Sequence, residues 1–406
     1  MKILVITQIY PQPDDVGDDK PTRTVEYFAK EWVEAGHEVV VFHCPSRFPI
    51  LAYCLPNGVR NWVSQKANTF IPPLSSIKKI RRNEFGIHIY RYPFFKLYPG
   101  KAYSKNSLLR YSKKICVLLE EIAFIPDLVM GHFANPSLEV VANIADHFHC
   151  KSSIVFHHDC GEKNIRRYRI AENIGRVKAV GARSITEARE MQDLLNLKKL
   201  PFICYSGVPN SIVADASSFC DRHDFSNHIN HLFVGGMIKR KCLRETIVAY
   251  DTVYKNDPRA TFKIIGGGPE ENSIKDLLSG LKNESIVLLG TKPRDVVQQE
   301  MKKANVLTMI SENETFGMVY VEAMLQGCIV IASYKGGFDG IIQDGVNGFL
   351  CKPGDSIMLE AVYRRINALS VKERNEIGNN AIQTANKLSE RDVALRYLND
   401  VIERNG

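Results

Sequence analysis

Residues 306–327 read VLTMISENETFGMVYVEAMLQG, which is a short apolar stretch, a polar stretch and a second apolar stretch. The first predicts a buried strand over 306–310, and the last predicts a helix that starts near Phe316. Apolar strands that alternate with helices are typical of parallel βαβ units, because helices cover both faces of a parallel sheet. This stretch therefore predicts one unit of a doubly wound α/β sheet.

The same alternation continues on both sides of this stretch, in two series. The strands of the first series are expected at 2–8, 38–42, 127–131 and 153–156, with a helix over 22–35 that Gly36 ends. The other strands of the second series are expected at 231–234, 261–265, 285–289 and 328–332, with a helix over 244–254. Two such series predict two Rossmann-like domains.

Chain length leads to the same domain count. The chain has 406 residues, and a single core stops growing at roughly 250–300 residues. A polar stretch at 209–230 separates the series and predicts a linker. We therefore expect an N-terminal domain over 1–208 and a C-terminal domain over 231–387. A final helix within 388–406 is expected to pack back on the first domain.

Composition limits the class of protein. Hydrophobic residues make up 45% and charged residues 24%, values that are ordinary for a soluble globular protein. The ten cysteines are scattered without a CxxC pair, which favours reduced thiols in a cytoplasm. The opening MKILVITQIYP reads as a buried strand rather than a signal peptide. We expect a cytoplasmic protein without a membrane-spanning segment.

The net charge of +8 is concentrated in one segment. Residues 78–114 carry eleven lysines and arginines, interleaved with aromatic residues, and only Glu84 opposes them. Such a segment can bind anionic lipid headgroups, which would place the protein on the inner face of the cytoplasmic membrane. A solvated face that only keeps the protein soluble is an equal alternative, and nucleic acid is less favoured than either.

Two glutamates flank the predicted start of the helix in 306–327. Helix N-termini expose unpaired N–H groups, so the amides of 316–319 are expected to bind a phosphate. Glu314 would then accept hydrogen bonds from sugar hydroxyls, and Glu322 would accept those of a ribose. The alternative is that Glu314 only caps the helix and Glu322 lies on the surface.

ETFGMVYVE, residues 314–322, resembles the E-x7-E signature of the retaining glycosyltransferases of family 4, which have the GT-B fold. VGGMIKRKC (234–242) and SYKGGFDGIIQDGVNGFLCKPGD (333–355) resemble two further motifs of this family. MKILVITQIYP with GHEVVVF and the turn SGVPNS complete a resemblance over nearly the whole chain. The resemblance implies two Rossmann-like domains that face an interdomain cleft.

The resemblance also implies a donor site. Lys241 would neutralise the donor diphosphate, Glu314 would contact the donor sugar, and Glu322 would hold the ribose. His157, at the end of a predicted strand, would contact the donor sugar, with the neighbouring His158 as the less favoured alternative and His132 as a weaker candidate. We assign catalysis to His157, Lys241 and Glu314, and donor binding to Gly235, Gly236, Lys241, Gly267, Thr291, Glu314, Phe316, Gly317, Met318, Val319 and Glu322.

The sequence departs from the family pattern at two charged positions, and at one of them Gly340 stands where the family often has a glutamate. Gly236 stands where the family has an arginine, and Lys239 or Arg240 is a candidate for the missing charge. The aspartates at 14, 15, 18 and 19 are interpreted as a mobile or solvated loop rather than a metal-binding DxD motif. We therefore predict no required metal or cofactor, because Lys241 and the helix amides would neutralise the diphosphate.

The predicted function is retaining transfer of a sugar from a UDP- or GDP-sugar to a glycan in surface polysaccharide biosynthesis, and we expect this glycan to be lipid-linked. The alternatives are a glycosyltransferase with a small-molecule acceptor, and an epimerase or phosphorylase of the same fold. An oxidoreductase is disfavoured because no GxGxxG follows the first strand. A sugar-binding protein without catalysis is disfavoured because its export would need a signal peptide.

Overall fold

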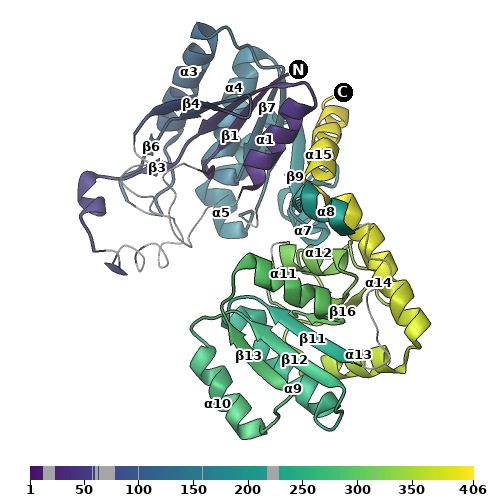
Figure 1. Cartoon of the computed structure of the whole chain (residues 1–406). Helices are drawn as coiled ribbons and strands as arrows, with labels where there is room; N and C mark the ends of the chain where they lie inside the picture. Colours follow the sequence, from purple (N-terminus) through teal and green to yellow (C-terminus); the bar gives the residue numbers. More distant parts are fainter. Residues whose placement is uncertain are drawn as a thin grey trace. The chain divides into compact units, whose positions relative to one another are not determined.

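The computed structural model describes residues 1–11, 23–56, 58–59, 63, 78–98, 100–157, 159–216, 228–314 and 316–406 (Figure 1). The fold is α/β, and the chain divides into two compact units. Unit 1 comprises Met1–Arg183, Glu187–Cys204 and Ala394–Gly406, and unit 2 comprises Ser184–Thr186 and Tyr205–Val393. The four predicted loop aspartates at 14–19 and His158 lie outside the described residues.

Unit 1 is built on an eight-stranded sheet with the order β10-β9-β8-β7-β1-β2-β5-β4. Among the described residues, the strand pairs of this sheet are parallel except the edge pair, in which β4 runs antiparallel to β5. The order reverses between β1 and β7, and ligands of open α/β sheets bind at such a switch point. The strands are β1 (Lys2–Thr7), β2 (Glu38–His43), β4 (Ile80–Glu84), β5 (Ile87–Arg91), β7 (Leu128–His132), β8 (Lys151–Val155), β9 (Ala179–Ala182) and β10 (Phe202–Ile203).

The central strands of this sheet are buried along almost their whole length, as expected for parallel strands with helices on both faces. Helix α1 buries Phe28 and Trp32, and Gly36 after it has the positive φ of +87° that a left-handed helix end requires. The helices described for this unit are α1 (Thr24–Glu34), α3 (Lys105–Glu121), α4 (Glu139–Phe148), α5 (Glu162–Arg167), α6 (Ile170–Asn173) and α7 (Ile185–Leu195). A small sheet pairs β3 (Ser46–Arg47) with β6 (Phe94–Phe95), and η1 (Ile50–Tyr53) follows β3.

Unit 2 has a six-stranded parallel sheet with the order β13-β12-β11-β14-β15-β16. In chain order this is 3-2-1-4-5-6, the arrangement of dinucleotide-binding sheets, and its switch point lies between β11 and β14. The strands are β11 (Ile229–Val234), β12 (Ala260–Ile265), β13 (Ile286–Gly290), β14 (Val306–Thr308), β15 (Ile329–Ser333) and β16 (Phe349–Cys351). The helices are α8 (Asn210–Ala216), α9 (Leu243–Tyr254), α10 (Glu271–Leu281), α11 (Arg294–Lys303), α12 (Met318–Leu325), α13 (Ser356–Ala368) and α14 (Val371–Ala385).

The last helix, α15 (Glu390–Arg404), belongs to both units. Residues from Ala394 onward lie in unit 1, where the Trp32 indole N–H donates to the backbone oxygen of Ala394 at 2.9 Å. We predicted a domain boundary after residue 208, and the described division of the chain falls between Cys204 and Tyr205. We had expected the segment 209–230 to be an irregular linker. Part of it is helical, because α8 forms directly after Pro209.

The basic segment 78–114 differs from a uniformly exposed surface. Arg91 and Lys96 are buried, with 2% and 6% of their surface exposed, so neither can contact a membrane or solvent freely. Burial lowers the pKa of Lys96 to about 8, and the nearby Arg167 contributes. Several aromatic residues of the segment also belong to the core; the rings of Phe94 and Tyr111, for example, stack 4.0 Å apart.

Candidate functional site

Two glycine turns lie side by side at the carboxyl edge of the unit 2 sheet. The Gly235 N–H after β11 donates to the Ile265 oxygen at 3.0 Å, and the Met237 N–H donates to the Gly267 oxygen at 2.9 Å. Gly266 has a φ of +144°, and a Cβ there would collide with the Gly235 oxygen. Only glycine permits this close approach of two backbones.

Thr291 lies beside the same turns. A Cβ added at Gly267 would stand 3.0 Å from the hydroxyl oxygen of Thr291, which follows β13. The structure thus brings together three predicted donor-binding residues that are far apart in the sequence, namely Gly235, Gly267 and Thr291. Gly236, the fourth predicted residue here, is exposed.

Lys241 and Glu314 form an ion pair at the switch point of this sheet. Lys241 ends the short helix η5 (Lys239–Lys241) after β11, and Glu314 lies in the loop after β14, the neighbouring strand. The Lys241 Nζ donates to Glu314 Oε2, and each of the two side chains is only 12% exposed. Arg240 adds a second positive charge, with Nη1 at 3.7 Å from the same oxygen. Glu314 is therefore a paired carboxylate and does not act merely as a helix cap.

Two backbone contacts hold this ion pair in place. The Glu312 N–H donates to the Arg240 oxygen at 2.7 Å, which joins the loop after β14 to η5. The Tyr320 hydroxyl donates to the Met309 oxygen at 2.6 Å, which anchors α12 to the end of β14. The Lys241 Nζ also lies 3.4 Å from the Met309 sulfur.

Helix α12 begins two residues later than predicted, at Met318 instead of near Phe316. Gly317 is its N-cap with a φ of +82°, and this left-handed conformation breaks the helical path before Met318. Phe316 is buried against Tyr205 and Phe338 instead of forming the first helical turn. Among the described residues, no side chain caps the first turn of α12. The Tyr320 N–H already donates to the Gly317 oxygen at 2.9 Å, which leaves the N–H groups of Met318 and Val319 for an anion.

Glu322 lies in the second turn of α12 and is mostly buried, which contradicts its interpretation as a surface residue. Its Oε1 accepts from the Arg294 guanidinium at 2.8 Å, at the start of α11. Burial raises the pKa of Glu322, and Arg294 opposes this rise only in part. Sequence reasoning missed Arg294, although its position directly after the Gly290-Thr291-Lys292-Pro293 turn was a usable signal.

The predicted histidine lies in unit 1, at the carboxyl ends of two neighbouring strands. His157 follows β8, and its Nε2 is 3.0 Å from Nδ1 of His132, the last residue of β7. The His157 ring stacks on Phe133 with a centroid distance of 4.0 Å. Asp159 accepts from the N–H groups of His157 and Ala134, which ties the two loops together.

His132 is fully buried, and burial together with the nearby Arg183 lowers its pKa to about 3. It is thus a neutral imidazole at physiological pH. In the parts of the chain that the structure describes, no three histidine, cysteine or acidic side chains are grouped to hold a metal ion. None of the described helices combines the length and the apolar character needed to cross a bilayer.

Comparison with known proteins finds glycosyltransferases similar to part of this chain. Residues 224–384 match the family described as glycosyl transferases group 1. The fold is GT-B, as in the similar solved structures of glycosyltransferases.

An uncharacterized glycosyltransferase of Methanocaldococcus jannaschii is 31% identical over 195 residues, 48% of this chain and 51% of that protein. The chain thus spans about half the length of this relative. A putative teichuronic acid biosynthesis glycosyltransferase of Bacillus subtilis is 23% identical over 376 residues, 90% of this chain and 89% of that protein. The crystal structure of Anabaena HepE in complex with UDP has a TM-score of 0.65 at 18% identity, and the match covers 99% of this chain and all of that one.

Proposed function

We propose that the protein is a retaining glycosyltransferase that uses a nucleoside diphosphate sugar as donor. The observation that carries the proposal is the Lys241–Glu314 ion pair, which lies at the sheet's switch point beside the open first turn of α12. An ammonium group and unpaired N–H groups suit a diphosphate, and a carboxylate suits sugar hydroxyls. UDP is the first donor nucleotide to test, because the similar HepE structure contains it.

Each charged group then has a role in the reaction. Lys241 stabilises the negative charge that grows on the diphosphate as the glycosidic bond breaks. Glu314 leaves its pairing with Lys241 and accepts from donor-sugar hydroxyls, while Glu322, oriented by Arg294, accepts from the ribose. His157 in unit 1 orients the donor sugar by a hydrogen bond.

Retention of the anomeric configuration belongs to the same proposal. The bond from the sugar carbon to the diphosphate oxygen breaks, and the bond to the acceptor oxygen forms on the same face of the sugar. The acceptor proton passes to the leaving diphosphate, through an oxocarbenium-like transition state. NMR of the product linkage tests this step, and an inverted product would exclude it.

A thermal-shift panel with UDP, GDP, CDP and their sugars tests the donor. A ligand that binds the folded state raises the melting temperature by mass action. We expect UDP or GDP to stabilise the wild type and to lose this effect in Lys241→Met. If none of the nucleotides or their sugars raises the melting temperature of the wild type above its value without nucleotide, the donor site is refuted.

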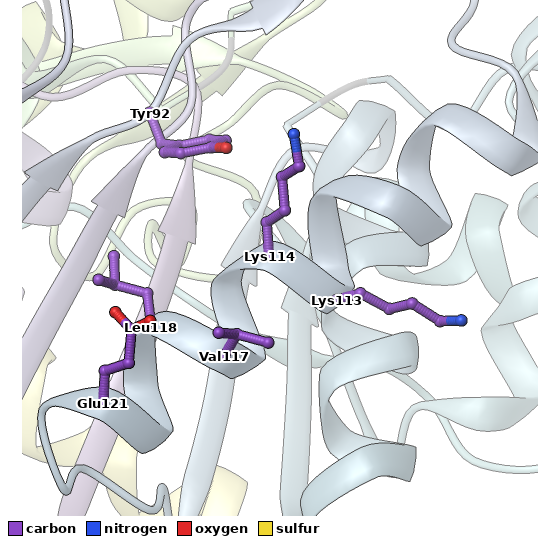
Figure 2. Close-up of a pocket in the computed structure, with 6 residues that line it drawn as sticks. All are labelled: Tyr92, Lys113, Lys114, Val117, Leu118 and Glu121. Carbon is purple, nitrogen blue, oxygen red and sulfur yellow. The ribbon is translucent and has the colours of Figure 1, made fainter.

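We further propose that the acceptor is a lipid-linked glycan and that unit 1 docks on an anionic membrane. The exposed cations of the basic segment support this, in particular Lys79, Lys113 and Lys114. Lys113 and Lys114 line a hollow of about 350 Å³ on α3, whose other walls are Tyr92, Val117, Leu118 and Glu121 (Figure 2). Lys79 lies over the Tyr92 ring at 4.5 Å. The two lysines of the hollow outweigh the single carboxylate of Glu121, and a hollow with net positive charge and a largely apolar lining suits anionic headgroups.

Vesicle sedimentation tests this docking. Each basic residue near an anionic surface contributes about 1 kcal/mol, so a Lys79, Lys113 and Lys114 triple change to Ser should weaken binding by about 100-fold. A triple change of the exposed Lys198, Lys199 and Lys255 to Ser removes the same charge elsewhere and serves as control. If both variants and the wild type sediment alike, the segment is a solvated face and a soluble acceptor becomes the better hypothesis.

A further inference from the structure

We propose that His132 is a positioning residue that fixes the tautomer and the ring plane of His157. The proposal rests on the proposed function, in which His157 contacts the donor sugar. His132 does not touch the donor in this scheme; it acts only through the ring of His157.

The contact between the two rings contains a single proton. His132 Nδ1 and His157 Nε2 are 3.0 Å apart, a hydrogen-bond distance at which one nitrogen must donate and the other must accept. His132 is fully buried and neutral, so it carries one N–H. Whichever nitrogen of His132 holds that proton decides the role of His157 in the bond.

The surroundings of His132 assign the proton to Nδ1. In the described residues, Nε2 of His132 is buried without a hydrogen-bond partner. A proton on this nitrogen would leave a buried N–H donor unpaired, and unpaired buried donors are rarer in proteins than under-satisfied acceptors. His132 therefore donates from Nδ1, and His157 accepts at Nε2 and keeps its own proton on Nδ1.

Packing then fixes the planes of both rings. The His132 ring lies 5.9 Å from Phe28 of α1 and 5.7 Å from Tyr397 of α15, stacked on the first and edge-on to the second. The His157 ring is parallel to Phe133 within 21°. With Nε2 bonded to His132 and one face stacked on Phe133, the His157 ring keeps its proton on Nδ1 and a single ring plane, and a fixed ring of this kind is what alignment of a donor sugar requires.

Nitrogen-15 NMR of the imidazole groups tests the assignment without any activity measurement. In the wild type we expect both His132 and His157 to be protonated at Nδ1 and unprotonated at Nε2. In His132→Leu the donor is lost, and His157 should become a mixture of both tautomers. A wild-type His157 protonated at Nε2, or a His157 spectrum unchanged in His132→Leu, would overturn the proposal.

Kinetics of matched variants test the consequence. His132→Leu should lower kcat by about 10- to 100-fold with little change in donor KM. His132→Asn places an amide N–H near the former Nδ1 and should restore most of kcat and the wild-type His157 tautomer. His231→Leu removes another fully buried histidine, in unit 2, whose pKa is likewise lowered to about 3 by burial, and should change neither the tautomer nor kcat.

The outcomes separate this proposal from the proposed function. If the tautomers behave as expected and no nucleotide sugar supports transfer, the function is wrong and the positioning contact stands. If transfer occurs and His132→Leu keeps the wild-type kcat in a folded protein, the positioning role is wrong and the function stands. Melting temperatures of the variants establish which of them are folded.

Discussion

Replacing Glu314 by Gln should have opposite effects on nucleotide binding and on transfer. Gln keeps the shape of the side chain and an acceptor oxygen, but it removes the negative charge that now faces Lys241. The Glu314 carboxylate neutralises the Lys241 ammonium in the ion pair, so a diphosphate must displace this carboxylate in order to bind Lys241. We therefore expect Glu314→Gln to bind UDP more tightly and to transfer sugar more slowly.

The burial of the pair sets the size of these effects. Breaking a fully buried ion pair by removing one partner costs about 3–5 kcal/mol. Lys241 and Glu314 each remain 12% exposed, and Gln keeps one hydrogen bond, so we expect a loss of about 2 kcal/mol in unfolding free energy. In Glu314→Gln the Lys241 ammonium is no longer neutralised by a carboxylate, and this should tighten UDP binding by about tenfold, or 1.4 kcal/mol.

Chemical unfolding and calorimetric titration with UDP measure both quantities. The control is Glu300→Gln, because Glu300 is 13% exposed and its carboxylate pairs with Lys263 at 2.6 Å. Neither residue belongs to the proposed donor site. This control should lose similar stability without any change in UDP affinity. Weaker UDP binding in Glu314→Gln, or wild-type turnover in the folded variant, is incompatible with a carboxylate that both neutralises Lys241 and contacts the donor sugar.

Three further predictions concern the same site. Burial raises the pKa of Glu322 above its usual 4.5, so the folded protein holds this proton to higher pH than the unfolded chain does. Wild-type stability should therefore fall as the pH rises above 4.5, and Glu322→Gln should remove that part of the fall in melting scans at increasing pH. Transfer should survive excess EDTA; complete loss that magnesium or manganese restores would assign a metal to residues such as the 14–19 aspartates. In calorimetric titration, Arg240→Ala should weaken UDP binding more than Lys239→Ala does. Adding Gly236→Arg to the Arg240→Ala variant should restore part of the lost UDP affinity.

The order of strands and helices could be predicted because the pattern is local. The strand after residue 305 was expected over 306–310 and is found at Val306–Thr308, and the helix expected over 22–35 is found at Thr24–Glu34. Parallel strands are buried on both faces, so each is a short apolar run that the sequence shows directly. The boundaries differ by one or two residues because capping, as at Gly317, depends on backbone conformation.

Contacts between distant residues could not be predicted from such patterns. Lys241 and Glu314 are 73 residues apart, and only the sheet order places β11 beside β14. The burial of Arg91 was missed for a similar reason, because a charged residue in a basic segment gives no sign of its position in a sheet. The contact between His132 and His157 likewise follows from the pairing of β7 with β8.

The missing family arginine at Gly236 can be accounted for by charge and space. Family resemblance places a guanidinium beside the first glycine turn, and here a Cβ at Gly236 would meet only the Gly267 oxygen, at 3.9 Å. The position is thus open, and Gly236 has no positive φ that would disfavour a side chain. Of the two candidate replacements, Arg240 reaches Glu314 at 3.7 Å, whereas Lys239 makes no ion pair in the described part of the chain. Under the proposed function Glu314 would turn to the donor sugar, and Arg240 and Lys241 would then both lose the carboxylate with which they pair. A diphosphate there would meet two positive charges, one of which is planar and can bind phosphate oxygens in a bidentate way.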